Sequence, residues 1–195
     1  MKRTKNRSIP LRATAARHRI STPPSQGNVI RHSRSPDETR RIGELIGRRV
    51  QGGDWIALEG NLGAGKTHFI QGLARGLDIE APVTSPTFVY VHEFRGRCPF
   101  AHVDLYRIER AADLPGLGLE DYFESPWVTA VEWADKGGGH LPAERLTVRI
   151  ARARGTRETH RRIEVTATGG RYQNILEALK KINRHSGTRP GKGKL

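Results

Sequence analysis

Residues 60–67, Gly-Asn-Leu-Gly-Ala-Gly-Lys-Thr, form the pattern of a phosphate-binding loop. They follow a short apolar run at 55–59 that predicts a buried strand, and they precede residues 68–76, whose apolar side chains recur at helical spacing. A strand, a glycine-rich turn, Lys-Thr and a helix, in that order, form the context in which this pattern binds nucleotide phosphates. A chance match in an ordinary loop would not be expected to have a strand before it and a helix after it. We therefore expect a nucleotide site here.

The chemistry of this loop follows from its residue types. Glycines let the backbone curl so that successive N–H groups point at phosphate oxygens, and the N-terminus of the following helix adds the positive end of its dipole. The sequence predicts that Lys66 reaches the β- and γ-phosphates and that the Thr67 hydroxyl holds Mg²⁺. The candidate nucleotide-binding residues of the loop are Asn61, Gly63, Ala64, Gly65, Lys66, Thr67 and His68.

The basic character of the chain is concentrated at its two ends. Of the formal net charge of +14, residues 1–34 carry +9, with nine Lys or Arg and no acidic residue, and residues 171–195 carry +6. The remaining residues, 35–170, therefore carry −1. Basic arms of this kind bind RNA or acidic surfaces through counterion release. A solvated arm without a specific partner is the alternative.

Length and composition restrict the class of protein. A chain of 195 residues is expected to form one globular domain. It has no apolar run of 18 residues, which argues against a membrane span. The single Cys98 cannot form an internal disulfide, which fits a reducing compartment, and the first residues lack the apolar segment of a secretory signal. We therefore expect a cytoplasmic protein without a membrane partner.

Three segments are predicted along the chain: a disordered basic arm over 1–34, a single domain over 35–185, and a disordered basic tail over 186–195. Ordered structure is expected to begin with a helix that Ser35 caps. Pro36 suits the first helical position, and Glu38 completes a capping box with Ser35.

Two pairs of strands are expected to form antiparallel hairpins. Residues 88–94 and 98–105 flank a short turn. Residues 146–150 and 162–166 alternate apolar and polar side chains, as an edge hairpin does. Both pairs depart from an all-parallel sheet. Residues 136–140, which include three glycines, are expected to form a flexible loop.

Two acidic residues stand where predicted strands end. Asp104 ends one strand and Glu132 ends another, and residues 85–88, Ser-Pro-Thr-Phe, follow the first crossover, where switch-like segments approach the γ-phosphate. In α/β sheets, ligands gather at the carboxyl ends of the strands, so these residues are expected to converge with the loop. A carboxylate at a strand end is also what organises Mg²⁺ beside a phosphate-binding loop.

The order and spacing of six motifs between about residues 35 and 150 resemble the bacterial TsaE family, the ATPase subunits of tRNA threonylcarbamoyladenosine biosynthesis. The motifs are Ser-Pro-Asp-Glu-Thr (35–39), the glycine-rich loop (60–67), Ser-Pro-Thr-Phe (85–88), His-Val-Asp-Leu-Tyr-Arg (102–107), Leu-Gly-Leu-Glu-Asp-Tyr (117–122) and Val-Glu-Trp (131–133). Together they are far more specific than the loop alone. The family usually has an acid at Asn61 and often a threonine at His68, and the long N-terminal arm is outside its pattern.

The resemblance implies an α/β fold of the P-loop NTPase-like kind, a three-layer sandwich with a mixed sheet that includes antiparallel hairpins. It implies ATP and Mg²⁺ as cofactors and slow ATP hydrolysis that a complex stimulates. The implied partner is the two-subunit threonylcarbamoyl transferase heterodimer that modifies adenosine 37 of tRNAs reading ANN codons. Hydrolysis would reset that complex, and tRNA would be met indirectly or through the basic arms.

The resemblance also implies roles for single residues: catalytic for Lys66, Asp104 and Glu132, metal-binding for Thr67, Asp104 and Glu132, and nucleotide-binding for Thr87 and Trp133. Each of four has a structural alternative. Thr87 would satisfy a turn, Asp104 would cap the following short helix, Glu132 would pair with a surface arginine, and Trp133 would fill a core or an interface. His102 is expected to be a packing residue.

Two other functions stay open from the sequence. A small-molecule kinase of the same fold would need a mobile lid with arginines, and the candidates for it are Arg152, Arg154, Arg157, Arg161 and Arg162. A nucleotide-gated RNA-binding or assembly module would use the basic arms. These arms lack aromatic residues before Tyr172, so they offer no evident platform for base stacking.

Overall fold

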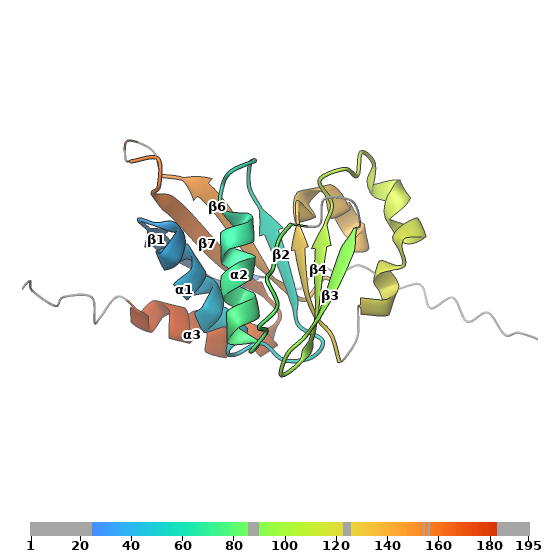
Figure 1. Ribbon diagram of the computed structural model, residues 1–195, viewed down its shortest axis with the longest axis horizontal. Helices are drawn as coiled ribbons and strands as arrows, with labels where there is room; N and C mark the ends of the chain where they lie inside the picture. The colour runs from blue at the N-terminus through green and yellow to red at the C-terminus, as the bar shows by residue number, and fades with distance from the viewer. Residues whose placement is uncertain (1–24, 86–89, 123–125, 154, 156, 183–195) are drawn as a thin grey trace, which may run out of the picture.

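The computed structural model describes residues 25–85, 90–122, 126–153, 155 and 157–182 (Figure 1). Within these residues the strands are β1 (Ser25–Ser33), β2 (Trp55–Glu59), β3 (Val91–Arg95), β4 (Pro99–Asp104), β5 (Val128–Glu132), β6 (Arg145–Arg152) and β7 (Arg161–Thr168). The α-helices are α1 (Pro36–Gly47), α2 (Lys66–Gly76) and α3 (Gln173–Lys181), and the 3₁₀-helices are η1 (Ala111–Leu117), η2 (Leu119–Tyr122), η3 (Ala134–His140) and η4 (Gly170–Tyr172). None of these described helices has the length and apolar character that a membrane span requires.

The strands form one mixed sheet in the order β1-β7-β6-β2-β5-β4-β3. The inner strands β6, β2, β5 and β4 run parallel to one another, while β3 pairs antiparallel with β4, and β7 with β6. Both predicted hairpins are therefore present. The β6–β7 hairpin does not form the edge that its alternation suggested, because β1 pairs antiparallel with β7 on its outer side. The parallel strands bring the carboxyl ends of β2, β4 and β5 to one edge of the sheet (Figure 1).

Strand β1 corrects the expectation that residues 1–34 form a disordered arm, which is wrong for residues 25–33. These residues pair with β7 from Ser25 opposite Thr168 to Ser33 opposite Arg161. Val29 is buried in the core, and the Arg31 Nε donates to the carbonyl of Leu179 at 2.8 Å, which ties the strand to the end of α3. Residues 1–24 and the predicted tail over 186–195 lie outside the described residues.

Helix α1 begins as its sequence predicts. The backbone N–H of Glu38 donates to the Ser35 side chain at 3.2 Å, and Pro36 occupies the first turn. The Glu38 carboxylate accepts from the backbone N–H of Arg34 at 2.7 Å, one residue earlier than in a regular capping box. The cap therefore also anchors the connection from β1, and it fixes where α1 enters the layer above the sheet.

Helices α1 and α2 pack with their backbones in close contact through four glycines. A Cβ added to Gly43 or Gly47 on α1 would lie 2.2 Å from a carbonyl oxygen of α2. A Cβ added to Gly76 on α2 would lie 2.4 Å from a carbonyl of α1, and one added to Gly72 would lie 1.9 Å from the Arg40 oxygen. These glycines set the distance between α1 and the helix that follows the glycine-rich loop.

We expect Gly72→Ala to lower the free energy of unfolding by about 3 kcal/mol, because the new methyl group meets a backbone oxygen that cannot rotate away. Gly116→Ala is the matched control: a Cβ there meets nothing within 4 Å, so we expect a change of at most about 0.5 kcal/mol. Urea unfolding followed by circular dichroism measures both. Equal unfolding midpoints for the two variants would contradict the close packing of α1 on α2.

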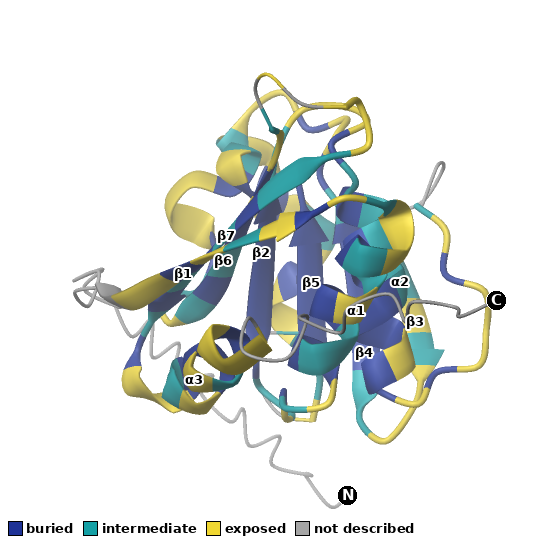
Figure 2. Cartoon of the chain, turned by 90° about the vertical axis from the view of Figure 1, so that its left-hand side faces the viewer, coloured by how far each residue is buried: buried dark blue, intermediate teal, exposed yellow. Residues whose placement is uncertain are grey.

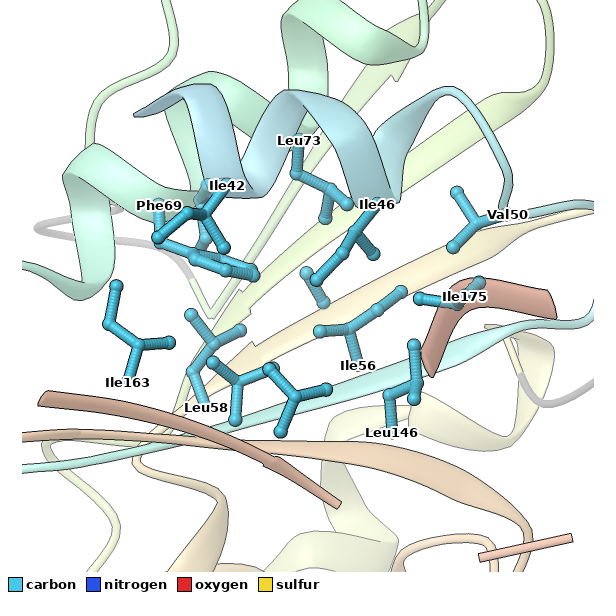
Figure 3. Packing of buried hydrophobic residues seen from close by; sticks show 14 of the residues in the cluster. Ile42, Ile46, Val50, Ile56, Leu58, Phe69, Leu73, Leu146, Ile163 and Ile175 are labelled. Atoms are coloured by element: carbon cyan, nitrogen blue, oxygen red, sulfur yellow. The ribbon is translucent and has the colours of Figure 1, made fainter. Parts of the chain in front are cut away.

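Buried side chains fill both faces of the sheet, which gives the predicted three layers. On one face, Ile42 and Ile46 of α1 and Phe69 of α2 pack towards Ile56 and Leu58 of β2 (Figure 3). On the other face, η1, η2 and η3 cover β2, β4 and β5, so this outer layer consists of 3₁₀-helices instead of α-helices. Strands β2 and β5 lie between the two layers and are buried almost throughout (Figure 2).

Residues 136–140 were expected to form a flexible loop, and this expectation is wrong. They belong to η3, which is irregular at Gly138, where φ is 54°. Gly137 is buried, and a Cβ there would lie 2.7 Å from the side chain of Leu141. The glycines therefore allow η3 to pack against neighbouring apolar side chains beside the carboxyl end of β5.

Candidate functional site

The glycine-rich loop joins β2 to α2, as its sequence context predicts. Gly60, Gly63 and Gly65 have positive φ angles of 145°, 72° and 107°. These values are unfavourable for residues with a side chain. A Cβ on Gly60 would also lie 2.3 Å from the carbonyl oxygen of Ile150. The start of the loop is therefore in close contact with the backbone of β6. Gly65 takes the N-cap position of α2, so the free N–H groups of its first turn face the space beside the loop.

A pocket of about 650 Å³ lies over this loop. The carboxyl ends of β4 and β5, the start of α1 and the β6–β7 hairpin form its other walls. The residues predicted from the sequence that line this pocket are Gly63, Ala64, Gly65, Lys66, Thr67, His68, Asp104, Glu132 and Trp133. Asn61 lines a neighbouring pocket together with Arg149, and Thr87 lies outside the described residues.

The Lys66 ammonium is held at the mouth of the loop. Lys66 is 5% exposed, and its Nζ donates to the carbonyl of Gly60 at 2.7 Å and to that of Asn61 at 3.2 Å. Burial lowers the pKa of Lys66 below its ordinary value, and the nearby carboxylates of Glu132 and Asp104 partly oppose this shift. A polyphosphate entering the pocket would supply the additional negative charge that favours the ammonium form.

Trp133 forms a wall of the pocket next to Lys66. The Lys66 Nζ lies 3.7 Å from the centroid of its ring, a cation–π contact. The Tyr106 ring packs against the Trp133 ring at a tilt of 49°, with the two ring centroids 5.1 Å apart. The backbone of Trp133 is left-handed, with φ at 58° and ψ at 40°. This conformation is rare for a bulky residue, and such strain gathers at functional sites. The structure therefore places Trp133 at the pocket surface, beside the loop.

The two predicted acids lie side by side at the ends of β4 and β5. Asp104 and Glu132 are register partners in the parallel pair. The Thr67 hydroxyl donates to Glu132 Oε1 at 3.4 Å. The Ser85 hydroxyl donates to Asp104 Oδ2 at 3.0 Å and is 3.3 Å from Glu132 Oε1. The loop hydroxyl therefore reaches Glu132, and the Ser85 hydroxyl bridges the two carboxylates.

This group of oxygens has the donor chemistry that Mg²⁺ prefers. Mg²⁺ is usually held by one or two carboxylates together with phosphate oxygens and water, and here Thr67, Asp104 and Glu132 supply a hydroxyl and two carboxylates. Among the described residues, no group of three or more His, Cys, Asp or Glu side chains could hold a metal ion by itself. The residues present fit Mg²⁺ bound jointly with a phosphate.

Asp104 uses its two carboxylate oxygens differently. Its Oδ1 accepts from the backbone N–H of Tyr106 at 2.8 Å and so caps the turn after β4. This is a turn and not the short helix that Asp104 was expected to cap as an alternative, because the next helix, η1, begins at Ala111. Its Oδ2 accepts from Ser85, and Asp104 lines the pocket.

His102 and Arg161 are site neighbours whose positions sequence reasoning did not predict. His102 was expected to be a packing residue. It is fully buried, and its Nε2 also lies 3.1 Å from Glu132 Oε1. The sequence did contain a signal for this position: His102 and Asp104 are two residues apart on one strand, and such residues point to the same face of the sheet. Arg161 contacts the loop across 97 residues of sequence, a separation for which no local pattern gives a signal.

Comparisons with known proteins identify a family and several similar chains. Residues 33–163 match the family model described as "Threonylcarbamoyl adenosine biosynthesis protein TsaE". A Bacillus subtilis protein named tRNA threonylcarbamoyladenosine biosynthesis protein TsaE is 42% identical over 146 residues, which cover 74% of this chain and 89% of that protein. A Streptomyces coelicolor protein of the same name is 40% identical over 138 residues, covering 68% and 93% of the two chains.

A crystal structure titled Bacillus subtilis YdiB is similar to this one with a TM-score of 0.67 at 36% sequence identity, and it covers 80% of this chain and 97% of that chain. This similarity confirms the predicted P-loop-like α/β fold. The family match covers two thirds of the sequence and includes the loop, both acids, β6 and the start of β7. This chain belongs to the TsaE family.

Proposed function

We propose that this protein is a Mg²⁺-dependent ATPase that acts in the biosynthesis of threonylcarbamoyladenosine in tRNA. The observation that carries the proposal is the meeting of Lys66, Thr67, Asp104 and Glu132 in one pocket over a glycine-rich loop. The names of the relatives support the pathway, and the geometry of the pocket supports the chemistry.

The loop and Lys66 bind the phosphates in this proposal. Backbone N–H groups of the loop and of the first turn of α2 donate to phosphate oxygens. The Lys66 ammonium exchanges its two carbonyl partners for β- and γ-phosphate oxygens, which carry more negative charge. Trp133 keeps the ammonium near this position, because their cation–π contact does not depend on the carbonyls.

The hydroxyl and carboxylates organise the reaction. Thr67, Asp104 and Glu132 would hold Mg²⁺, which when bound neutralises charge on the β- and γ-phosphates. Glu132 accepts a hydrogen bond from the attacking water and orients its oxygen towards the γ-phosphorus. A bond then forms from the water oxygen to the γ-phosphorus, and the bond from this phosphorus to the β–γ bridging oxygen breaks. The water proton passes to an oxygen of the departing phosphate, so ADP and phosphate result. His102 and Ser85 hold the Glu132 carboxylate in place.

The proposed partners are the two-subunit threonylcarbamoyl transferase and, indirectly or through the basic ends of the chain, tRNA. The ATPase does not carry out the transfer itself; its hydrolysis resets the transferase complex for a further cycle. The pathway named for the relatives supports this role, and the +9 charge of residues 1–34 supports contact with an anionic partner.

Asp104→Asn tests the metal role without removing the cap. The new amide oxygen can still accept from the Tyr106 N–H, so folding should persist. We expect the Mg²⁺ concentration for half-maximal hydrolysis to rise at least about tenfold, because a charged ligand is lost. Asp113→Asn, at a side chain 52% exposed and far from the pocket lining, is the control and should not move it. An unchanged magnesium titration in Asp104→Asn would count against the metal role.

A further inference from the structure

The β6–β7 hairpin places an arginine directly over the glycine-rich loop. Arg161, the first residue of β7, donates from Nε to the carbonyl of Ala64 at 2.7 Å and from Nη2 to the carbonyl of Gly63 at 3.2 Å. Its Nη1 donates to the carbonyl of His160 at 3.0 Å and also contacts that of Glu158. All three guanidinium nitrogens therefore donate to backbone carbonyls. The two carbonyls that accept from Nε and Nη2 belong to the loop.

The carbonyl groups of the loop need hydrogen-bond donors for a geometric reason. A loop that turns its N–H groups inward to a phosphate turns its carbonyls outward, and those carbonyls still require donors. Here two cationic side chains each donate to a different pair of these carbonyls. Lys66 holds the carbonyls of Gly60 and Asn61, and Arg161 holds those of Gly63 and Ala64.

The two cations differ in what happens when a polyphosphate enters. Both side chains line the pocket, and the Lys66 ammonium is the group that turns to phosphate. The Arg161 guanidinium is fixed at both ends by carbonyls, so its contacts with the loop do not compete with that movement. After Lys66 has released its carbonyls, Arg161 is the cation that still holds the second half of the loop.

We propose that Arg161 is a positioning residue that fixes the glycine-rich loop in its phosphate-binding shape. This inference rests on the proposed nucleotide site and deepens it. A loop that already has its binding shape loses no conformational entropy when the nucleotide binds, so its nucleotide affinity is higher than that of a loop that must first become ordered. The side chain must be arginine, since Nε and Nη2 form a rigid pair of parallel donors that matches two neighbouring carbonyls, whereas the single ammonium of lysine does not.

The adjacent residue supplies a matched control. Arg162 follows Arg161 on β7, so its side chain points to the opposite face of the strand. It pairs with Glu164 at 2.8 Å and is absent from the lining of the nucleotide pocket. Arg162→Ala removes the same charge from the same hairpin without touching the loop carbonyls.

The experiment compares Arg161→Ala, Arg161→Lys, Arg162→Ala and Lys66→Ala with the wild type. The dissociation constant of a fluorescent ADP analogue measures affinity, and amide hydrogen exchange of residues 60–67 in nucleotide-free protein measures loop order. We expect both Arg161 variants to bind about tenfold more weakly and to exchange these amides faster, with thermal midpoints near that of the wild type. Arg162→Ala should match the wild type in all three measurements. Added guanidinium should restore part of the affinity of Arg161→Ala, whereas equal sodium chloride should not.

Each contrary result has a distinct meaning. Wild-type affinity and exchange in Arg161→Ala would overturn the positioning role. Full recovery in Arg161→Lys would overturn it in favour of a simple charge effect. Wild-type affinity in Lys66→Ala would instead overturn the nucleotide site itself, and the inference with it.

Discussion

Lys66→Ala is expected to weaken the binding of Mg²⁺-ATP by at least about 100-fold, equivalent to about 2.7 kcal/mol, and to abolish measurable hydrolysis. Lys66 is buried beside the loop and reaches the pocket with a single ammonium. Removal of the ammonium leaves the β- and γ-phosphates without their nearest fixed cation, and charge-assisted bonds to phosphate are among the strong ones. No other lysine lines the described pocket.

Affinity is measured with a fluorescent ATP analogue, and hydrolysis by phosphate release. Lys180→Ala serves as the control, because Lys180 is an exposed lysine on α3 that pairs with Glu177 at 2.7 Å. It should bind and hydrolyse ATP as the wild type does. Circular dichroism checks that Lys66→Ala is folded. Retained ATP binding in a folded Lys66→Ala protein would refute the assignment of the loop.

At saturating Mg²⁺, Glu132→Gln is expected to lower kcat by about 100-fold, within the range for a residue that organises proton transfer, while nucleotide affinity changes by less than about threefold. Glutamine keeps the volume of the side chain and an oxygen that can accept from Thr67 and Ser85. It loses the negative charge that would orient the attacking water. The defect should therefore appear in turnover and not in binding.

Single-turnover hydrolysis and equilibrium binding separate these two effects. The control is Glu59→Gln, which removes a carboxylate from the end of the neighbouring strand β2, where Glu59 pairs with Arg149 at 2.6 Å and lies outside the nucleotide pocket. Its kcat should stay within about twofold of the wild type. Wild-type turnover in Glu132→Gln would leave Glu132 with a structural role only.

The parts of the fold that sequence predicted correctly are those with strong local signals. The loop carries its own glycine spacing, and Ser35 and Pro36 mark the start of α1. Strand β1 lacks such a signal: among its residues whose burial is described, Val29 is the one apolar residue that is buried, and the polar and basic residues around it resemble a solvated arm. Its order comes from β7, whose paired residues lie 128 to 143 positions later in the sequence and supply the hydrogen bonds.

The candidate site divides in the same way. Asp104 and Glu132 could be placed because parallel strands end at one edge of a sheet. The position of Arg161 over the loop could not, because the sequence suggested an edge hairpin with lid-like arginines. The structure shows β7 inside the sheet and the Arg161 guanidinium on loop carbonyls. Pairing partners that are distant in sequence decided both outcomes.

The most direct test of the proposed role is ATP hydrolysis by the purified protein, alone and with the two transferase subunits and tRNA. We expect the wild-type protein to hydrolyse ATP slowly alone and faster in the presence of the transferase and tRNA, and we expect Lys66→Ala to show no hydrolysis in either condition. Hydrolysis that is unchanged by the transferase, or ADP formation that requires a small-molecule acceptor, would contradict the proposed role.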